Sequence, residues 1–189
     1  DWAIELGKAE WGVTVLEANG EADAGDIWSN RSFSTRQVGK SSLYRHEVRS
    51  AAIDAIIEAV TKVAGGAAPQ GLDPRDPQVT GQARPLMRQE LRAIYWEADS
   101  TDTVIRKIRA GEGHPGVLDQ IQGTGFHLFG AHREQALSGR AGEIIAQRDG
   151  AICRATVDGA VWVTHLTRGG GDPHTYFKLP ATRALALAG

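Results

Sequence analysis

The clearest pattern of apolar and polar positions lies in residues 11–28, where two short apolar runs flank an acidic turn. Val13 and Val15 alternate with small or polar residues, as in a short buried strand, and Ile27 begins the second run. An Asn-Gly and an Ala-Gly pair between the runs are typical of turns. The pattern predicts a strand, a turn and a second strand, with Asp23 held on the turn.

A helix is predicted next, within residues 39–66. Ser41 or Ser42 can cap its start, and the Gly65-Gly66 pair can end it. We expect the helix to pack through one apolar face, formed by Val48, Ala52, Ala55, Ile56, Ala59, Val60 and Val63.

Residues 65–81 contain three prolines and four glycines without periodicity, which predicts a connector between two domains. Near the start of the second domain, residues 84–96 are interpreted as a strand that enters a new core. Ser100 can then cap a short helix that runs to Ala110. We therefore place the first domain at residues 1–64 and the start of the second at residue 82.

The pattern after this helix is typical of strands, first at residues 126–131 and then throughout residues 143–166. Asp149-Gly150 and Asp158-Gly159 are favourable hairpin turns, so three antiparallel strands are expected in the second stretch. A small β-barrel or half-barrel with one helix would protect their edges. This domain is assigned to residues 82–168, and residues 169–189 are interpreted as a linker.

The composition is that of a globular protein, with 41% hydrophobic and 23% charged residues. No apolar stretch is long enough to span a bilayer, and the N-terminus lacks the pattern of a secretion signal. We therefore expect a cytoplasmic protein without membrane contact. Cys153 lies in an alternating run and is interpreted as an inert core thiol.

The charge distribution argues against nucleic acid as a partner. Residues 80–189 carry 13 basic and 11 acidic groups, without the strongly basic balance of nucleic-acid-binding domains. A local cluster of Arg31, Arg36, Lys40, Arg45 and Arg49 is interrupted by Glu47 alone. The cluster is either a phosphate-contacting patch or a solvated face.

Few residues form a recognisable chemical motif. The six histidines have no metal-site spacing, and no G-x-S-x-G elbow is present, so neither a metal site nor a serine hydrolase is predicted. Trp96 and Trp162 are interpreted as core residues rather than stacking platforms. Asp23 has two interpretations, a carboxylate that bonds its own turn or a catalytic group.

A resemblance favours the catalytic interpretation. The D-x-G-x-I arrangement from Asp23, following the G-V-T of residues 12–14, resembles the turn that carries the catalytic aspartate in folate-dependent formyltransferases. In that family the aspartate acts with an asparagine and a histidine. The resemblance places both before Asp1, so we assign no histidine of this chain to them.

A second match lies in residues 93–117, which resemble the start of the C-terminal domain of methionyl-tRNA formyltransferase-like proteins. The whole chain resembles a family of hydrogenase maturation factors, HypX/HoxX, most distinctly at KSSLYR (residues 40–45) and FHLFGAHRE (residues 126–134). The resemblance implies the last part of a Rossmann-like α/β formyltransferase domain, followed by an OB-like small β-barrel. The residues behind the second match are Ile94, Trp96, Ile105, Arg109, Ala110, Pro115 and Gly116.

The resemblance also implies an activity. The larger protein would transfer a formyl group from formyltetrahydrofolate to coenzyme A, on the way to the carbon monoxide ligand of nickel-iron hydrogenase. Its partners would be these small molecules and hydrogenase maturation proteins, and no metal is implied. On this interpretation Asp23 is catalytic and the chain is an internal piece that is inactive alone. Arg36, Lys40 and Arg45 are candidates, from charge alone, for contacts to the phosphates of coenzyme A.

Two alternatives stay open. The chain could belong to a methionyl-tRNA or sugar-amine formyltransferase of the same fold. It could also be a non-catalytic binding module built on the β-barrel. Formation of formyl-coenzyme A by the full-length protein would distinguish them.

Overall fold

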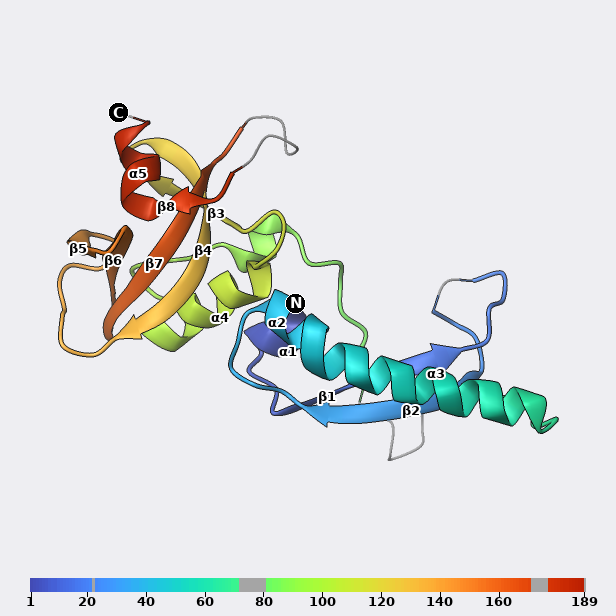
Figure 1. Cartoon of the computed structure of the whole chain (residues 1–189). Coiled ribbons are helices and arrows are strands. Elements are labelled where there is room, and N and C mark those ends of the chain that lie inside the picture. The colour runs from blue at the N-terminus through green and yellow to red at the C-terminus, as the bar shows by residue number, and fades with distance from the viewer. Residues whose placement is uncertain (22, 72–80, 171–176, 189) are drawn as a thin grey trace. The chain divides into compact units, whose positions relative to one another are not determined.

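The computed structural model describes residues 1–21, 23–71, 81–170 and 177–188. The chain forms two compact units (Figure 1). One unit contains Lys8–Arg36 and Ser42–Pro85, and the other contains Asp1–Gly7, Gln37–Ser41 and Leu86–Gly189. Two short segments from the first quarter of the sequence therefore belong to the β-rich unit, which the sequence pattern does not reveal.

The first unit is built on an antiparallel pair of strands. Strands β1 (Glu10–Leu16) and β2 (Ile27–Ser34) pair in a register that places Val13 opposite Arg31. The predicted strand, turn and strand are thus confirmed. The expectation of a buried first strand is wrong, because Val13 and Val15 are only half-buried in a pair of strands covered by one helix.

The predicted helix is present as α2 (Lys40–Leu43), a π-helical turn (Tyr44–Val48) and α3 (Arg49–Ala64). Gly65 is its C-cap, which confirms the predicted end. The predicted cap at Ser41 or Ser42 is wrong, because both residues lie inside α2. The hydroxyl of Ser42 instead accepts a hydrogen bond of 3.4 Å from Arg36.

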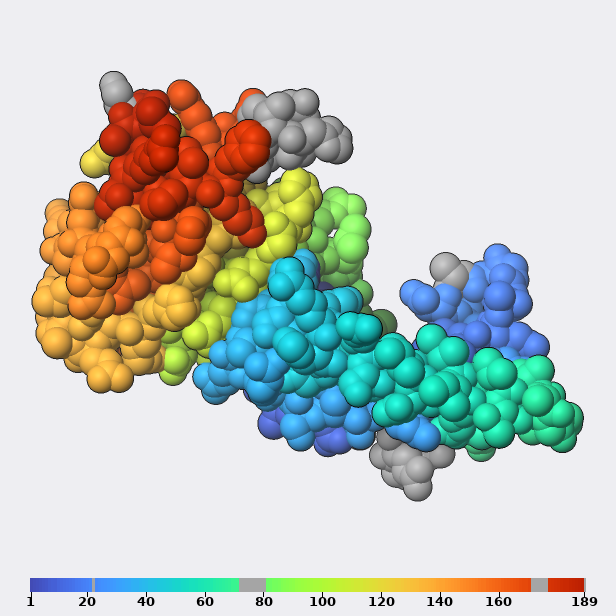
Figure 2. Space-filling model, viewed as in Figure 1, coloured from blue at the N-terminus to red at the C-terminus, as the bar shows by residue number. Residues whose placement is uncertain are grey.

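Helix α3, whose outer surface is coloured cyan to green in Figure 2, packs on β1 and β2 through a row of small side chains. Ala51, Ala55 and Ala59 are buried, and the hydroxyl of Ser29 donates a 2.6 Å hydrogen bond to the carbonyl oxygen of Ala55. Small residues allow this close approach of helix and strand. The predicted packing face is therefore only partly correct, because its larger aliphatic side chains are exposed. The exposed aliphatic residues of α3 are Ile53, Ile56, Ile57, Val60 and Val63.

The second unit is a curved antiparallel sheet with helices packed against it (Figure 1). The strand order is β3-β4-β7-β6-β5, and β8 pairs with β7. Helix α4 (Thr101–Gly111) packs on β4 and β7, and α5 (Ala181–Ala186) packs on β7. The strands are β3 (Val117–Ile121), β4 (Thr124–Glu134), β5 (Ile144–Arg148), β6 (Ala151–Thr156), β7 (Gly159–Arg168) and β8 (Leu179–Pro180).

The meander of β5, β6 and β7 confirms both predicted hairpins and the Asp149-Gly150 turn, but the second hairpin turns through Val157 and Asp158, because Gly159 already pairs with Thr156 as the first residue of β7. Asp149 and Gly150 have φ angles of 51° and 82°, as a tight hairpin turn requires. The sequence predicts a small β-barrel or a half-barrel, and a closed barrel is not formed, because β3 and β5 are the two ends of the strand order and do not pair within the described ranges. Helix α4 fills the concave side of the sheet, and its Val104, Ile105 and Ile108 lie in the core.

The predicted strand at residues 84–96 is wrong. This stretch contains a short 3-10 helix, Gln89–Arg92, followed by a turn. The carboxylate of Asp99 accepts the N–H of Tyr95 at 2.8 Å, and Asp99 N–H donates to the carbonyl oxygen of Tyr95 at 2.7 Å. These local bonds satisfy the backbone without a partner strand.

The segment interpreted as a linker, residues 169–189, includes described secondary structure. Strand β8 and helix α5 lie within it, and Ala181 and Ala184 are buried against the core. His174 falls outside the described residues, as does most of the connector predicted at residues 65–81. No helix within the described ranges is both long enough and apolar enough to cross a membrane.

Candidate functional site

Asp23 lies on the turn between β1 and β2, as the sequence predicts. Its φ of 59° places it in the left-handed region, which non-glycine residues rarely adopt. Below the turn, Glu17 N–H donates a 2.8 Å hydrogen bond to the carbonyl oxygen of Asp26. A Cβ at position 25 would lie 1.7 Å from the carbonyl oxygen of Glu17, so only glycine fits there. The base of the turn is therefore closely packed backbone.

The side chain that bonds the turn is Asn19, not Asp23. Its Oδ1 accepts from Glu21 N–H at 2.9 Å, and its Nδ2 donates to the carbonyl oxygen of Ala24 at 3.3 Å. Asp23 is exposed and makes no hydrogen bond or ion pair with the described residues. The carboxylate is thus accessible to a ligand or to another polar group.

The candidate phosphate-binding residues differ in whether a carboxylate of the chain already pairs with their positive charge. The guanidinium of Arg36 forms an ion pair with Glu47, with a second contact of 3.0 Å between Nη2 and Oε2. Lys40 Nζ lies 2.9 Å from Asp1 Oδ1. Arg45 is exposed on the π-helical turn and has no ion pair within the described ranges. Of these residues Arg45 is therefore the most accessible to an anion.

The pairing of Arg36 with Glu47 also shifts the pKa values of both groups. The hydrogen bond from Arg36 lowers the pKa of Glu47, and the same bond raises the pKa of Arg36. Both groups stay charged at neutral pH. A phosphate at Arg36 would have to displace a carboxylate that the sequence places only eleven residues away.

Side chains that could hold a metal are not brought together in the described part of the chain, where no group of three or more His, Cys, Asp or Glu is suitably placed. Cys153 is a buried free cysteine, as predicted. Burial raises the pKa of its thiol to about 11. The thiol is therefore protonated at neutral pH and is a poor nucleophile.

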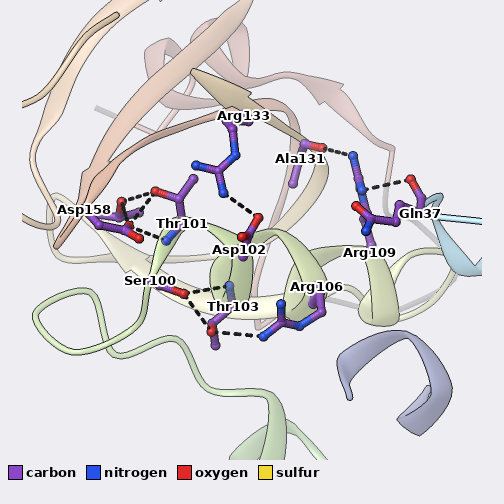
Figure 3. A network of polar contacts seen from close by, with 11 residues as sticks. Gln37, Ser100, Thr101, Asp102, Thr103, Arg106, Arg109, Ala131, Arg133 and Asp158 are labelled. Atoms are coloured by element: carbon purple, nitrogen blue, oxygen red, sulfur yellow. Dashed lines mark hydrogen bonds and ion pairs between the residues drawn. The ribbon is translucent and has the colours of Figure 1, made fainter. Parts of the chain in front are cut away.

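A polar network fixes the start of α4 in the β-rich unit (Figure 3). Ser100 is the N-cap, as predicted, and its hydroxyl accepts from Thr103 N–H at 3.3 Å. Asp158 accepts from Thr101 N–H at 2.7 Å and from the Thr101 hydroxyl at 2.8 Å, and these bonds lower its pKa. Asp158 thus lies in a hairpin turn and also binds the first residue of α4. The sequence predicts only the position in the hairpin.

Arginines on and beside α4 extend this network. Arg133 pairs with Asp102, and Arg109 donates to the carbonyl oxygens of Gln37, at 2.9 Å, and Ala131, at 3.4 Å. The bond to Gln37 ties the short segment Gln37–Ser41 to this unit. These arginines have structural partners in the chain and do not form an open anion site.

A buried ion pair lies in the core of the same unit. Arg154 pairs with Asp119, donates to the carbonyl oxygen of Gly142 at 2.9 Å and lies 3.9 Å from the ring centroid of Trp96. The indole N–H of Trp96 donates to Asp119 at 3.1 Å. Burial lowers the pKa of Arg154, whereas Asp119 opposes the shift. Trp96 is therefore a core residue, as predicted, but no local pattern indicates its charged neighbours.

Glu134 anchors the loop after β4. One carboxylate oxygen accepts from Gln135 N–H at 2.8 Å and Ala136 N–H at 2.7 Å, and the other accepts from Trp162 Nε1 at 2.6 Å. The bond from Ala136 N–H is the main cause that lowers the pKa of Glu134 to about 2. The indole of Trp162 is thereby fixed against the sheet, which agrees with its predicted core role.

These bonds predict a pH-dependent effect of Glu134→Gln. A carboxylate with a lowered pKa stabilises the fold fully above the unfolded value of 4.5, and this stabilisation is lost as the pH falls toward 2. We expect the variant to be less stable than the wild type at pH 7, with a difference that shrinks below pH 4.5. Denaturant unfolding at a series of pH values measures it, with Glu143→Gln as control. A difference that does not change with pH would contradict the assignment.

The chain is similar to known proteins over almost its whole length. Residues 86–177 match the family described as Formyl transferase, C-terminal domain. Over 187 residues the chain is 49% identical to the hydrogenase maturation factor HoxX of Bradyrhizobium diazoefficiens, covering 98% of this chain and 32% of that protein. It is 28% identical over 169 residues to a methionyl-tRNA formyltransferase of Carboxydothermus hydrogenoformans, covering 89% of this chain and 54% of the enzyme.

A solved structure agrees with these sequence matches. The crystal structure of HypX from Aquifex aeolicus in complex with tetrahydrofolic acid superimposes with a TM-score of 0.86 and 40% identity. The match covers 97% of this chain and 31% of HypX. The chain thus spans about a third of the length of the HoxX and HypX proteins that it matches.

Proposed function

Because the chain is a relative of the hydrogenase maturation factors HoxX and HypX over almost its whole length, we propose that its protein transfers a formyl group from formyltetrahydrofolate to coenzyme A. The formyl-coenzyme A would then serve the synthesis of the carbon monoxide ligand of nickel-iron hydrogenase. The observation that carries the proposal is the exposed carboxylate of Asp23 on the turn of a chain that is similar to a tetrahydrofolate-binding HypX.

The proposed reaction is an acyl transfer. The thiol sulfur attacks the formyl carbon, the carbon–nitrogen bond to the folate breaks, and the thiol proton is delivered to the folate nitrogen. Such a step requires a base for the thiol and stabilisation of the tetrahedral oxyanion. The whole protein must supply both.

Asp23 suits one part of this chemistry. A carboxylate is ordinarily a much weaker base than a thiolate, so it takes a proton from a thiol poorly. We therefore assign to Asp23 the role of assisting a histidine, by orienting its ring and stabilising the imidazolium that forms. We propose that this histidine belongs to a part of the protein outside these 189 residues, as the family resemblance suggests.

The phosphates of coenzyme A are proposed to bind near the basic cluster. Arg45 is the best placed contact, since it is exposed and has no carboxylate partner in the described residues. Arg36 and Lys40 could contribute only by exchanging their carboxylate partners for phosphate. Binding by this cluster would weaken with increasing salt concentration.

The decisive experiment measures formyl-coenzyme A after incubation of the full-length protein with formyltetrahydrofolate and coenzyme A. We expect a thioester product that depends on both substrates. Formylation of methionyl-tRNA or of a sugar amine in place of coenzyme A would support the alternative enzymes. The absence of transfer to any of the three acceptors would support a non-catalytic binding module.

A further inference from the structure

Asn19 bonds the backbone on both sides of Asp23. Its amide oxygen accepts from Glu21 N–H at 2.9 Å, two positions before Asp23, and its amide nitrogen donates to the carbonyl oxygen of Ala24 at 3.3 Å, one position after. One side chain thus spans the residues that flank the candidate catalytic carboxylate. Because both bonds are to backbone atoms, they restrain the backbone conformation of the turn.

The path of the chain at Asp23 needs such support. With a φ of 59°, Asp23 is in a region that costs free energy for residues other than glycine. Its side chain has no bond of its own within the described residues, so the carboxylate does not hold this conformation. At the base of the turn, Gly25 packs against the backbone of Glu17. Asn19 supplies the side-chain bonds between that base and Asp23.

We propose that Asn19 is a positioning residue for Asp23 in the formyl-transfer reaction, an inference that rests on the function proposed above. The Asn19 amide holds the turn in the left-handed conformation, and that conformation sets the direction in which the Asp23 carboxylate points. Loss of the amide lets the turn relax, so that the carboxylate is present but misplaced. Catalysis is sensitive to such a displacement, because small errors in the position of a reacting group cost large factors in rate.

The test uses the full-length protein and four variants, with formyl-coenzyme A formation as the assay. Asn19→Ala removes both bonds, and Asn19→Asp keeps an acceptor for Glu21 N–H but loses the donor to Ala24. Asn30→Ala is the matched control, because Asn30 is exposed on β2 and its side chain has no hydrogen bond within the described ranges. Asp23→Asn reports whether the carboxylate itself is needed.

We expect Asn19→Ala to lower kcat by about 10- to 100-fold with little change in KM, since positioning acts on the reacting group rather than on substrate binding. Asn19→Asp should lie between this variant and the wild type, and Asn30→Ala should match the wild type. Hydrogen exchange at the Glu21 amide should become faster in Asn19→Ala, because that amide loses its acceptor. The exchange readout does not depend on activity.

The results that would contradict the positioning role of Asn19 differ from those that would contradict the catalytic role of Asp23. Wild-type kcat in Asn19→Ala, together with an inactive Asp23→Asn, would overturn the positioning role and leave the proposed function intact. Unchanged exchange at Glu21 in Asn19→Ala would overturn the inference as well. Full activity of Asp23→Asn would instead overturn the role of Asp23. If Asn19→Ala does not fold, Asn19→Asp carries the same test, and wild-type kcat in it with faster exchange overturns the inference.

Discussion

Asp23→Asn in the full-length protein is expected to lower the rate of formyl-coenzyme A formation by up to about 10⁴-fold, the loss that follows removal of a carboxylate that orients a catalytic histidine. Asparagine has nearly the shape of aspartate but carries no charge to stabilise an imidazolium. Like aspartate, it tolerates the left-handed conformation that the turn requires at this position. The substitution therefore removes the chemistry and preserves the backbone.

The exposure of Asp23 makes this a clean test. Since the carboxylate has no structural partner within the described residues, the free energy of unfolding should change little. Asp26→Asn is the matched control, because Asp26 is an exposed carboxylate near the same turn, at the start of β2. Equal loss of activity in both variants would indicate an effect of charge on the whole turn, and wild-type turnover in Asp23→Asn would remove Asp23 from the mechanism.

Asp119→Ala is expected to destabilise the β-rich unit by about 3–5 kcal/mol, the usual cost of leaving a buried charge without its partner. The side chain of Arg154 is only 7% exposed, and the lost carboxylate is its ion-pair partner. The indole N–H of Trp96 would lose its acceptor as well. Hydrogen exchange of the β6 and β7 amides in the full-length protein measures the free energy of opening.

Two further variants test whether the loss of stability comes from an unpaired buried charge or only from the loss of an ion-pair contact. Glu143→Ala breaks the exposed pair with Arg140, whose side chain is 80% exposed, and should cost less than about 1 kcal/mol. Replacing both buried partners, as in Asp119→Leu with Arg154→Met, should recover most of the lost stability because no charge stays buried. A cost below about 1 kcal/mol for Asp119→Ala would show that water or a rearranged side chain compensates Arg154.

Local patterns predicted the parts of the fold that depend on neighbouring residues. Asp149 adopts the positive φ of a hairpin turn, and Ser100 caps α4, because both roles need only the adjacent backbone. The strand, turn and strand around Asp23 follow from a period of two and from turn residues. These signals act within a few positions along the chain.

Patterns failed where side-chain hydrogen bonds or the packing of one element on another decide the outcome. The apolar stretch before Trp96 has the composition of a strand, but the bonds of Asp99 turn it into a bend that places the indole in the core. Helix α3 approaches its strands through alanines, because a close approach excludes the larger Ile56 and Val60 from the interface. The periodicity of apolar residues identifies the apolar face of a helix, but it does not tell which residues of that face contact the neighbouring strands.

The candidate site was predictable to the same limited extent. The position of Asp23 on the turn follows from the sequence, whereas the pairing of Arg36 with Glu47 requires two elements to meet. The anchoring of α4 by Asp158 joins residues 57 positions apart and has no local signal. The role of Asn19 was partly predictable. The sequence indicates an asparagine in a turn, but its two hydrogen bonds to the backbone are known only from the structure.

The buried thiol of Cys153 has a practical consequence for labelling experiments. Maleimide and similar reagents react with the thiolate, which is scarce at neutral pH when the pKa is about 11. A cysteine introduced at exposed Ser50 of α3 would therefore be modified in preference to the native one. A fluorophore or spin label at that position could follow substrate binding without first removing Cys153 from the core.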